Sequence, residues 1–100
     1  MKELTKQDIL EYLKSKKDEL SSKYGLVKIG LFGSYARETY HDKSDIDIAI
    51  EIQKDKKSLH NFLGIKRELE KNLNKKVDLG IFSSLKKRAK IMIEKEIVYV

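Results

Sequence analysis

A strict two-residue alternation runs through the middle of the chain, in the segment DIDIAIEI from Asp45 to Ile52. Successive side chains of a β-strand point to opposite faces, so the segment places isoleucine at four positions of one face. Asp45, Asp47 and Glu51 fall on the opposite face. The pattern predicts a strand that packs its isoleucine face on a hydrophobic core. The acidic face must serve another purpose, because strands disfavour aspartate.

Two further segments show the same alternation, LVKIGLF at residues 26–32 and KVDLGIF at residues 76–82. One face of each carries only valine, isoleucine or leucine, and we place Val27 on this core face of the first segment. The opposite faces carry Gly30, Asp78 and Gly80. Glycine within a strand is typical of a place where something approaches the backbone closely. We therefore expect a sheet with one face on the core and the other open to a ligand.

Helical patterns occupy the segments before and between these strands. Thr5, followed three residues later by Asp8, is typical of a helix N-cap and predicts a helix over residues 6–23. Gly25 is suited to end that helix in a left-handed turn. A short helix is expected after the glycine and serine that follow the first strand.

The second half of the chain predicts two more helices. Apolar residues recur every three or four positions over residues 58–73, and Asn74 is expected to close that helix. Ser83 or Ser84 is expected to cap a last helix. The apolar side of this last helix would carry Leu85, Ala89, Met92 and Ile93. The final residues, IVYV, predict a short strand or tail.

The order of elements predicts the fold class. Helix, strand, short helix, strand, helix, strand and helix make an α/β fold with a small single mixed sheet and helices packed on one face. A length of 100 residues predicts one domain, over residues 1–100. The core of such a domain is modest, so we expect any large acceptor to be supplied by a partner.

The aspartates are candidate metal ligands. Asp45 and Asp47 lie two residues apart on one face, about 6.5 Å along the strand. Carboxylates so placed can share two Mg²⁺ ions, as in nucleotidyl transfer. Asp78 adds a third carboxylate on the matching face of the third strand. The alternative is that Asp45 and Asp47 face water and Asp78 pairs with a lysine.

The segment FGSYAR follows the first strand and opens a short helix. Gly33 can adopt a backbone conformation closed to other residues, and the amides after it, with Ser34, can bind phosphate. An ordinary helix N-cap has the same appearance. The turn becomes informative through its spacing, because Ser34 precedes Asp45 by eleven residues.

Charge and composition exclude several functions. The net charge of +6 arises entirely in residues 51–100, where thirteen basic residues face seven acidic ones. A lysine-rich face is usually solvated or attracts anions. Aromatic residues are sparse in that half, which argues against a direct nucleic-acid ligand. No apolar run is long enough to span a membrane, and the absence of cysteine is typical of a cytoplasmic protein.

The segment GSYARETYHDKSDIDIAI, with VDLG about thirty residues later, resembles the minimal nucleotidyltransferases of the DNA polymerase beta-like superfamily. The signature of that superfamily is a Gly-Ser turn, Asp-x-Asp and a later aspartate. The resemblance implies that Gly33 and Ser34 bind the triphosphate of ATP. It implies that Asp45 and Asp47 hold two Mg²⁺ ions, and that Asp78 completes the metal site or acts as base. Members commonly have glycine where this chain has Glu38, which puts only the local turn in doubt.

Short members of this family resemble antitoxins that act on HEPN-type ribonuclease toxins. The implied reaction transfers AMP from ATP to a tyrosine hydroxyl group of the toxin. Two alternatives stay open: a binding module that silences its partner by occlusion, and a nucleotidyltransferase that modifies a small molecule. The sequence also leaves open whether the chain forms a homodimer. Roles for Arg37, His41 and His60 stay open too, although a salt bridge is favoured for Arg37.

Overall fold

Four strands form one mixed sheet in the computed structural model, which describes residues 3–100. The strands lie in the order β3 (Val77–Ile81), β2 (Ile46–Ile52), β1 (Leu26–Phe32) and β4 (Val98–Tyr99). β2 and β3 run parallel, whereas β1 is antiparallel to both of its neighbours. The predicted mixed sheet is confirmed, and its fourth strand comes from the last residues of the chain.

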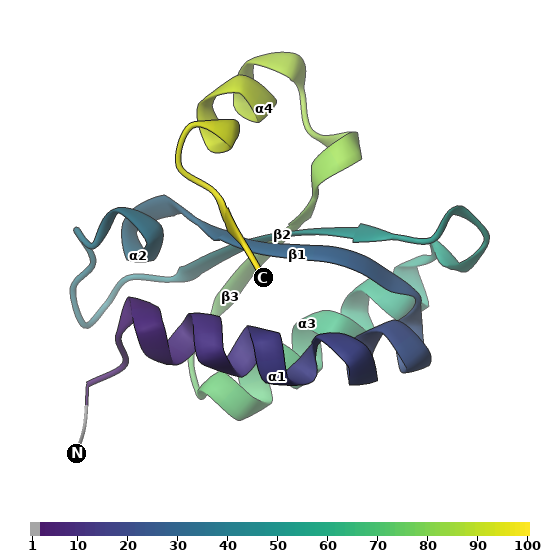
Figure 1. Cartoon of the computed structure of the whole chain (residues 1–100), viewed down its shortest axis with the longest axis horizontal. Helices are drawn as coiled ribbons and strands as arrows, with labels where there is room; N and C mark the ends of the chain where they lie inside the picture. The colour runs from purple at the N-terminus through teal and green to yellow at the C-terminus, as the bar shows by residue number, and fades with distance from the viewer. Residues whose placement is uncertain (1–2) are drawn as a thin grey trace.

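Helices lie on both sides of this sheet, as Figure 1 shows. α1 (Lys6–Tyr24) and α3 (Leu59–Leu73) pack side by side on one face, as predicted. α4 (Lys87–Glu94) stands on the other side, and α2 (Gly33–Arg37) lies at one end of the sheet. Two short 3₁₀ turns complete the chain, η1 (Lys54–Lys56) and η2 (Phe82–Ser84).

The two long helices begin and end within one residue of their predicted bounds. The Thr5 hydroxyl accepts the Asp8 amide N–H at 3.1 Å, and the Asp8 carboxylate accepts the Thr5 amide N–H at 3.0 Å. This reciprocal capping box satisfies two donors at the start of α1. Gly25 ends α1 with a φ of 77°, and Asn74 ends α3 with a φ of 52°. Both termini are therefore encoded locally.

The core lies between the sheet and the pair α1 and α3. Ile46, Ile48 and Ile50 of β2 are at most 1% exposed, so the isoleucine face of the alternating segment is buried as predicted. The helices contribute the following buried residues: Ile9, Leu13 and Leu20 from α1, with Ile65, Leu69 and Leu73 from α3.

Val27 departs from the predicted pattern. We placed it on the core face, but its side chain is 50% exposed, whereas Leu26 and Ile29 are buried. The pairing of β1 with β2 shifts register between Leu26 and Lys28. Such a bulge adds one residue to a strand and reverses the faces before it. Strict alternation along β1 was therefore the wrong assumption at this end of the strand.

The last helix and Gly30 also differ from expectation. Ser83 and Ser84 lie in η2, and α4 begins three residues after Ser84 without a side-chain cap, so the predicted serine cap is wrong. Met92, expected on the apolar side of α4, is 65% exposed. The space over Gly30 is filled by Ile97 and Tyr99 from the end of the chain, which a Cβ atom would contact at 2.8 Å. The close approach at Gly30 is therefore internal.

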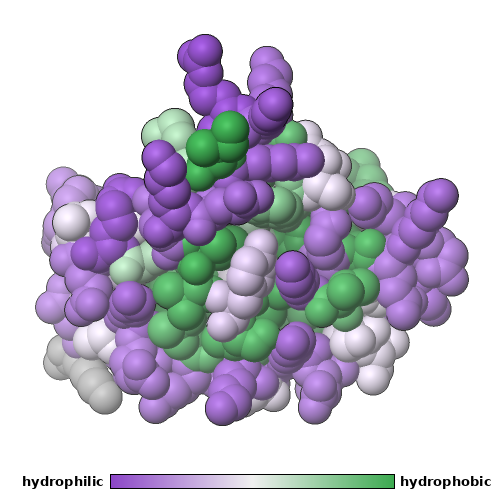
Figure 2. Space-filling view, turned by 45° about the horizontal axis from the view of Figure 1, so that its top comes forward, coloured by the Kyte–Doolittle hydropathy of each residue, from purple (hydrophilic) through white to green (hydrophobic). Residues whose placement is uncertain are grey.

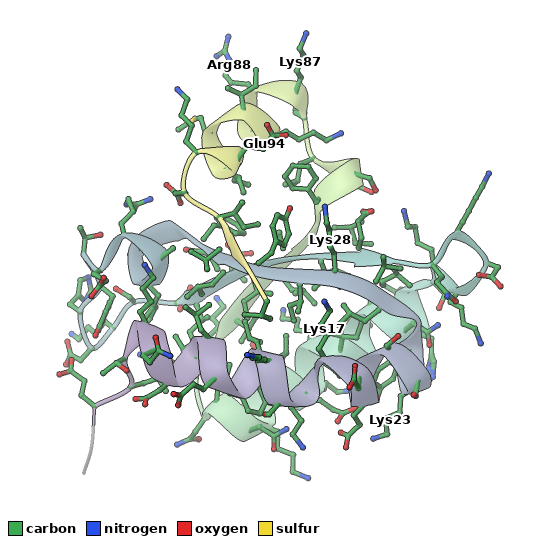
Figure 3. The ribbon with its side chains drawn as sticks, viewed as in Figure 1. Lys17, Lys23, Lys28, Lys87, Arg88 and Glu94 are labelled. Carbon is green, nitrogen blue, oxygen red and sulfur yellow. The ribbon has the colours of Figure 1, made fainter. Side chains whose placement is uncertain are left out.

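Basic side chains cover much of the surface. Figure 2 shows hydrophilic residues around a hydrophobic area on the side that carries α4, and Figure 3 shows Lys87 and Arg88 projecting away from the sheet. Among residues 3–100, no helix combines the length and the hydropathy needed to cross a membrane.

Candidate functional site

The turn between β1 and α2 places backbone directly against a carboxylate. Gly33 has a φ of 75°, in the left-handed region that favours glycine. A Cβ atom added at Gly33 would overlap the carboxylate of Asp47. Glycine at this position is therefore required twice, by the conformation of the turn and by the neighbouring side chain.

Ser34 follows in the first turn of α2 and is half-buried. Its carbonyl oxygen accepts the amide N–H of Thr39 at 2.9 Å, which closes this short helix. The predicted phosphate-binding role of Gly33 and Ser34 stays a prediction. What the structure adds is position, because the turn adjoins Asp47.

Asp47 and Asp78 lie side by side on neighbouring strands. They are directly paired in the parallel ladder of β2 and β3, so their side chains share one face at a strand separation of about 4.8 Å. Asp45 lies just before β2 and is exposed, two residues from Asp47. The three predicted acids are thus brought to one end of the sheet, on the face opposite the core.

The electrostatics of Asp47 follow from this arrangement. Burial of the side chain, and next the negative charges of Asp78 and Asp45, raise the pKa of Asp47 to about 6. Arg37 opposes this shift and Glu96 adds to it. Ionisation of Asp47 therefore costs more free energy than ionisation of an exposed aspartate, and a bound cation would relieve this cost.

The acids do not form a complete metal cage. Within residues 3–100, no group of three or more acidic or histidine side chains is gathered closely enough to hold a metal ion. Mg²⁺ does not require such a cage, because it commonly takes one or two carboxylates and completes its shell with water and substrate phosphates. Asp47 and Asp78 supply hard oxygen ligands of this kind, so the residues present fit magnesium bound together with a nucleotide.

An ion pair between Arg37 and Glu96 borders this site. The Glu96 carboxylate accepts Arg37 Nη1 at 2.9 and 3.1 Å and also accepts the amide N–H of Gly33. The predicted salt bridge of Arg37 is confirmed. Its partner could not be predicted, because no local pattern links residues 59 positions apart.

A cleft of about 320 Å³ lies between α4 and these residues. Its walls come from the β1–α2 turn, from β2 and from the segment that leads to β4. The lining residues are Phe32, Gly33, Arg37, Asp47, Ala89, Met92, Ile93 and Glu96. The cleft therefore brings together the predicted Gly33 turn and Asp47, the predicted acid with the raised pKa. Its other wall, from α4 and Glu96, depends on the tertiary structure.

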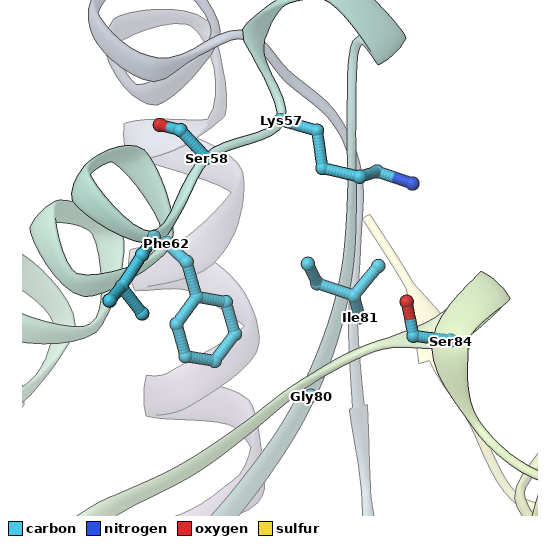
Figure 4. Close-up of a pocket in the computed structure, with 7 residues that line it drawn as sticks. Lys57, Ser58, Phe62, Gly80, Ile81 and Ser84 are labelled. Carbon is cyan, nitrogen blue, oxygen red and sulfur yellow. The ribbon is translucent and has the colours of Figure 1, made fainter.

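A larger, apolar pocket of about 470 Å³ lies elsewhere, at the outer edge of β3. Figure 4 shows Phe62 and Lys57 on one side of it and Ile81 and Ser84 on the other. None of the three predicted acids lines this pocket. We assign the functional site to the smaller cleft, because Asp47 and Gly33 form its wall.

The remaining polar and aromatic candidates lie outside the cleft. Tyr35 and Tyr40 stack with ring centroids 4.2 Å apart, and Tyr35 is buried, so packing explains these tyrosines. His41 and His60 are both exposed. His41 accepts a backbone hydrogen bond from Lys43 within its loop.

Comparison with known proteins agrees with this geometry. The model of the nucleotidyltransferase domain family matches residues 13–100. A protein adenylyltransferase, MntA, of Thermococcus cleftensis is 37% identical over 97 residues, which cover 97% of each chain.

Solved structures are similar as well. A chain of a toxin–antitoxin complex with AMP-PNP superimposes with a TM-score of 0.69 at 27% identity, over 86% of this chain and 70% of that one. The fold also matches a complex of a tri-AMPylated HEPN toxin of Shewanella oneidensis with an MNT antitoxin. That match has a TM-score of 0.68 at 21% identity and covers 95% and 71% of the two chains. From the family match and the close relative, we conclude that this chain belongs to the nucleotidyltransferase domain family.

Proposed function

We propose that this protein is a magnesium-dependent protein adenylyltransferase. It transfers AMP from ATP to a tyrosine hydroxyl group of a HEPN-type toxin and thereby acts as the antitoxin. The pairing of Asp47 with Asp78 beside the Gly33 turn carries the proposal. Two carboxylates there lie next to groups that are candidates to donate hydrogen bonds to phosphate. The named activity of the Thermococcus relative and the toxin–antitoxin complexes of similar fold support the choice of acceptor.

The size of the chain favours an acceptor on another protein. The cleft of about 320 Å³ would be largely occupied by a nucleotide, which leaves little room for a small-molecule acceptor. A tyrosine carried by a partner needs no pocket of its own in this chain, since the partner supplies the binding surface.

Each residue of the site has a role in this scheme. Asp47 and Asp78, with Asp45 beside them, hold Mg²⁺, which when bound neutralises phosphate charge and orients the triphosphate. Gly33 and Ser34 hold the outer phosphates through backbone amides and the serine hydroxyl. Ala89, Met92 and Ile93 of α4 form the far wall of the cleft, against which the nucleotide would lie.

The reaction exchanges one phosphorus–oxygen bond for another. The tyrosine oxygen attacks the α-phosphorus of ATP, and a new bond forms between them. The bond from the α-phosphorus to the oxygen shared with the β-phosphate breaks, and pyrophosphate leaves with that electron pair. The hydroxyl proton passes to a carboxylate, for which the exposed Asp78 is our candidate.

Label transfer tests the proposal. The protein is incubated with ATP labelled at the α-phosphate, Mg²⁺ and a HEPN-type protein from the same organism as the candidate partner. We expect label on the partner with the wild type and a loss of at least about a hundredfold with Asp47→Asn. Asp55→Asn, an exposed aspartate in η1, is the matched control and should retain the activity.

Other outcomes would contradict the proposal. Absence of label on the partner with the wild type would exclude protein adenylylation. If the double variant Asp45→Ala, Asp47→Ala still silenced the toxin in cells, the protein would act by occlusion, and the transfer reaction would not be needed for its function.

A further inference from the structure

The carboxylate of Glu96 holds two donors that face the cleft. One is the amide N–H of Gly33, and the other is the Arg37 guanidinium, which Glu96 binds with both carboxylate oxygens. Glu96 lies between α4 and β4, and its side chain is 23% exposed. Nothing in the proposed reaction uses this residue.

The chemistry of these donors suits phosphate as well as carboxylate. A guanidinium binds either anion through paired N–H groups, and a backbone amide donates to the oxygen of either. The observed carboxylate thus marks a position where the site already binds a negatively charged oxygen. Gly33 is also a residue that the proposed function assigns to the triphosphate, so a phosphate and Glu96 would need the same donor.

Glu96 and a bound triphosphate would repel each other if both lay beside the Gly33 amide, because both are negatively charged. Glu96 and Asp47 line the same cleft, and the charge of Glu96 already contributes to the raised pKa of Asp47. A phosphate entering beside both carboxylates would meet like charges in a partly desolvated site. When the Glu96 carboxylate leaves the Gly33 amide and Arg37, its repulsion of the phosphate is relieved.

We propose that Glu96 is a place-holder for a nucleotide phosphate: its carboxylate occupies the Gly33 amide and Arg37 in the free protein and yields both to a phosphate of the nucleotide. In this scheme Arg37 becomes a phosphate ligand, and Glu96 determines how tightly nucleotide binds. The inference rests on the proposed function in one respect, the binding of a nucleoside triphosphate in the cleft.

The exchange requires only a side-chain rotation. The backbone on either side of Glu96 is held, since the amides of Glu96 and Ile97 both donate to the Ile93 carbonyl at 3.0 and 2.9 Å. Beyond it, β4 pairs with β1, and Ile97 and Tyr99 pack over Gly30. The glutamate side chain can leave Gly33 toward solvent while these contacts persist.

The test is calorimetric titration with a non-hydrolysable ATP analogue in the presence of Mg²⁺. Glu96→Gln keeps an oxygen that can accept from Gly33 but removes the charge. We expect it to bind the analogue about tenfold more tightly than the wild type, the size of effect typical of removing one like charge. The affinity of Glu96→Gln for inorganic tripolyphosphate should rise by a similar factor. Its affinity for adenosine, which carries no phosphate, should equal that of the wild type.

Two variants sharpen the interpretation. Glu94→Gln removes the same charge two residues away, on α4, where the side chain is exposed, and should leave the affinity unchanged (Figure 3). In an Arg37→Gln background, Glu96→Gln should lose most of its gain, because the two residues act through one interaction. Circular dichroism and thermal unfolding verify that each variant is folded.

A measurement on the wild type keeps the proposal falsifiable if the variants do not fold. The Gly33 amide signal in a proton–nitrogen NMR spectrum should shift when tripolyphosphate saturates the protein. A Gly33 signal that stays in place while the ligand binds would overturn the proposal, as would unchanged or weaker nucleotide binding by folded Glu96→Gln.

Failure of the proposed function gives a different result. If the wild type transfers no AMP to its partner but Glu96→Gln still binds the analogue more tightly, the place-holder role stands and the transfer reaction does not. If the wild type transfers AMP and Glu96→Gln gains no affinity, the place-holder role alone is wrong.

Discussion

Asp47 shows at the scale of one residue how a candidate metal ligand opposes the stability of the fold that carries it. Its neighbours in β2, Ile46 and Ile48, are completely buried in the core, whereas the side chain of Asp47 lines the cleft. Burial and two other aspartates raise its pKa to about 6, above the usual aspartate value of 3.8. The folded protein therefore binds a proton at Asp47 more tightly than the unfolded chain does.

This raised pKa predicts a pH-dependent stability. Between about pH 4 and pH 6 the folded state holds the proton that the unfolded state has lost, so the free energy of unfolding falls as the pH rises through this range. Asp47→Asn removes the titration. We expect the variant to be more stable than the wild type at pH 7, by about 1 kcal/mol after allowance for solvent screening. At pH 4 the two should be nearly equal.

Urea denaturation at pH 4 and pH 7, with EDTA present to remove cations, measures this difference. Asp55→Asn is the control and should follow the wild type at both pH values, since Asp55 is exposed. An Asp47→Asn variant that is less stable than the wild type at pH 7 would contradict the raised pKa.

At the scale of elements, the ends of α1 and α3 follow local rules. The predicted caps at Thr5, Gly25 and Asn74 are all present, and Ser58, which was placed inside the helix, caps α3 instead. The other helices follow such rules less well: α4 begins without a side-chain cap, and at the end of α2 Glu38 adopts a left-handed backbone with a φ of 61°. Glycine adopts this conformation without a steric penalty, so a glutamate at position 38 identifies a local strain in this chain.

Relief of that strain predicts a more stable protein. Glu38→Gly should raise the free energy of unfolding by about 0.5–1 kcal/mol, since the gain in backbone energy exceeds the entropy cost of glycine. Glu38→Ala is the matched control. It removes the 3.9 Å contact with Lys6 but keeps the strain, so it should change stability little. Thermal unfolding of both variants measures the effect, and equal behaviour of the two would refute it.

At the scale of the whole molecule, the site is an assembly of segments that are distant in sequence. The β1–α2 turn, the start of β2 and the α4–β4 connection meet only in the folded chain. A ligand that bridges these segments should therefore stabilise the fold as a unit, because it binds the folded state and not the unfolded chain.

We expect Mg²⁺ with an ATP analogue to raise the Tm of the wild type. At a hundredfold excess over Kd the stabilisation is about 2.7 kcal/mol, which corresponds to a shift on the order of 10 °C for a domain of this size. Differential scanning fluorimetry measures it. EDTA should reduce the shift, and Asp47→Asn should largely lose it; an equal shift in that variant would exclude Asp47 as a ligand of the magnesium-bound nucleotide.

The predictable part of this protein is the part that local pattern encodes. Alternation located β2 and β3, and capping residues located the ends of α1 and α3. Gly33, Ser34 and the three aspartates were selected as candidate site residues by type and spacing. Such signals are readable because strand faces and helix caps depend on residues a few positions apart. The bulge that exposes Val27 was not readable, since it depends on how β1 pairs with β2.

Tertiary structure alone decided the rest of the site. It pairs Asp78 with Asp47 on neighbouring strands and brings the Asp47 carboxylate into contact with Gly33. It also packs Ile97 and Tyr99 over Gly30. It also brought Glu96 across 59 positions to Arg37. These contacts depend on strand order and on where the last helix returns, which alternation and capping do not specify. The amino-acid sequence thus determined which groups the site contains, and the packing of distant segments determined their partners and their charge.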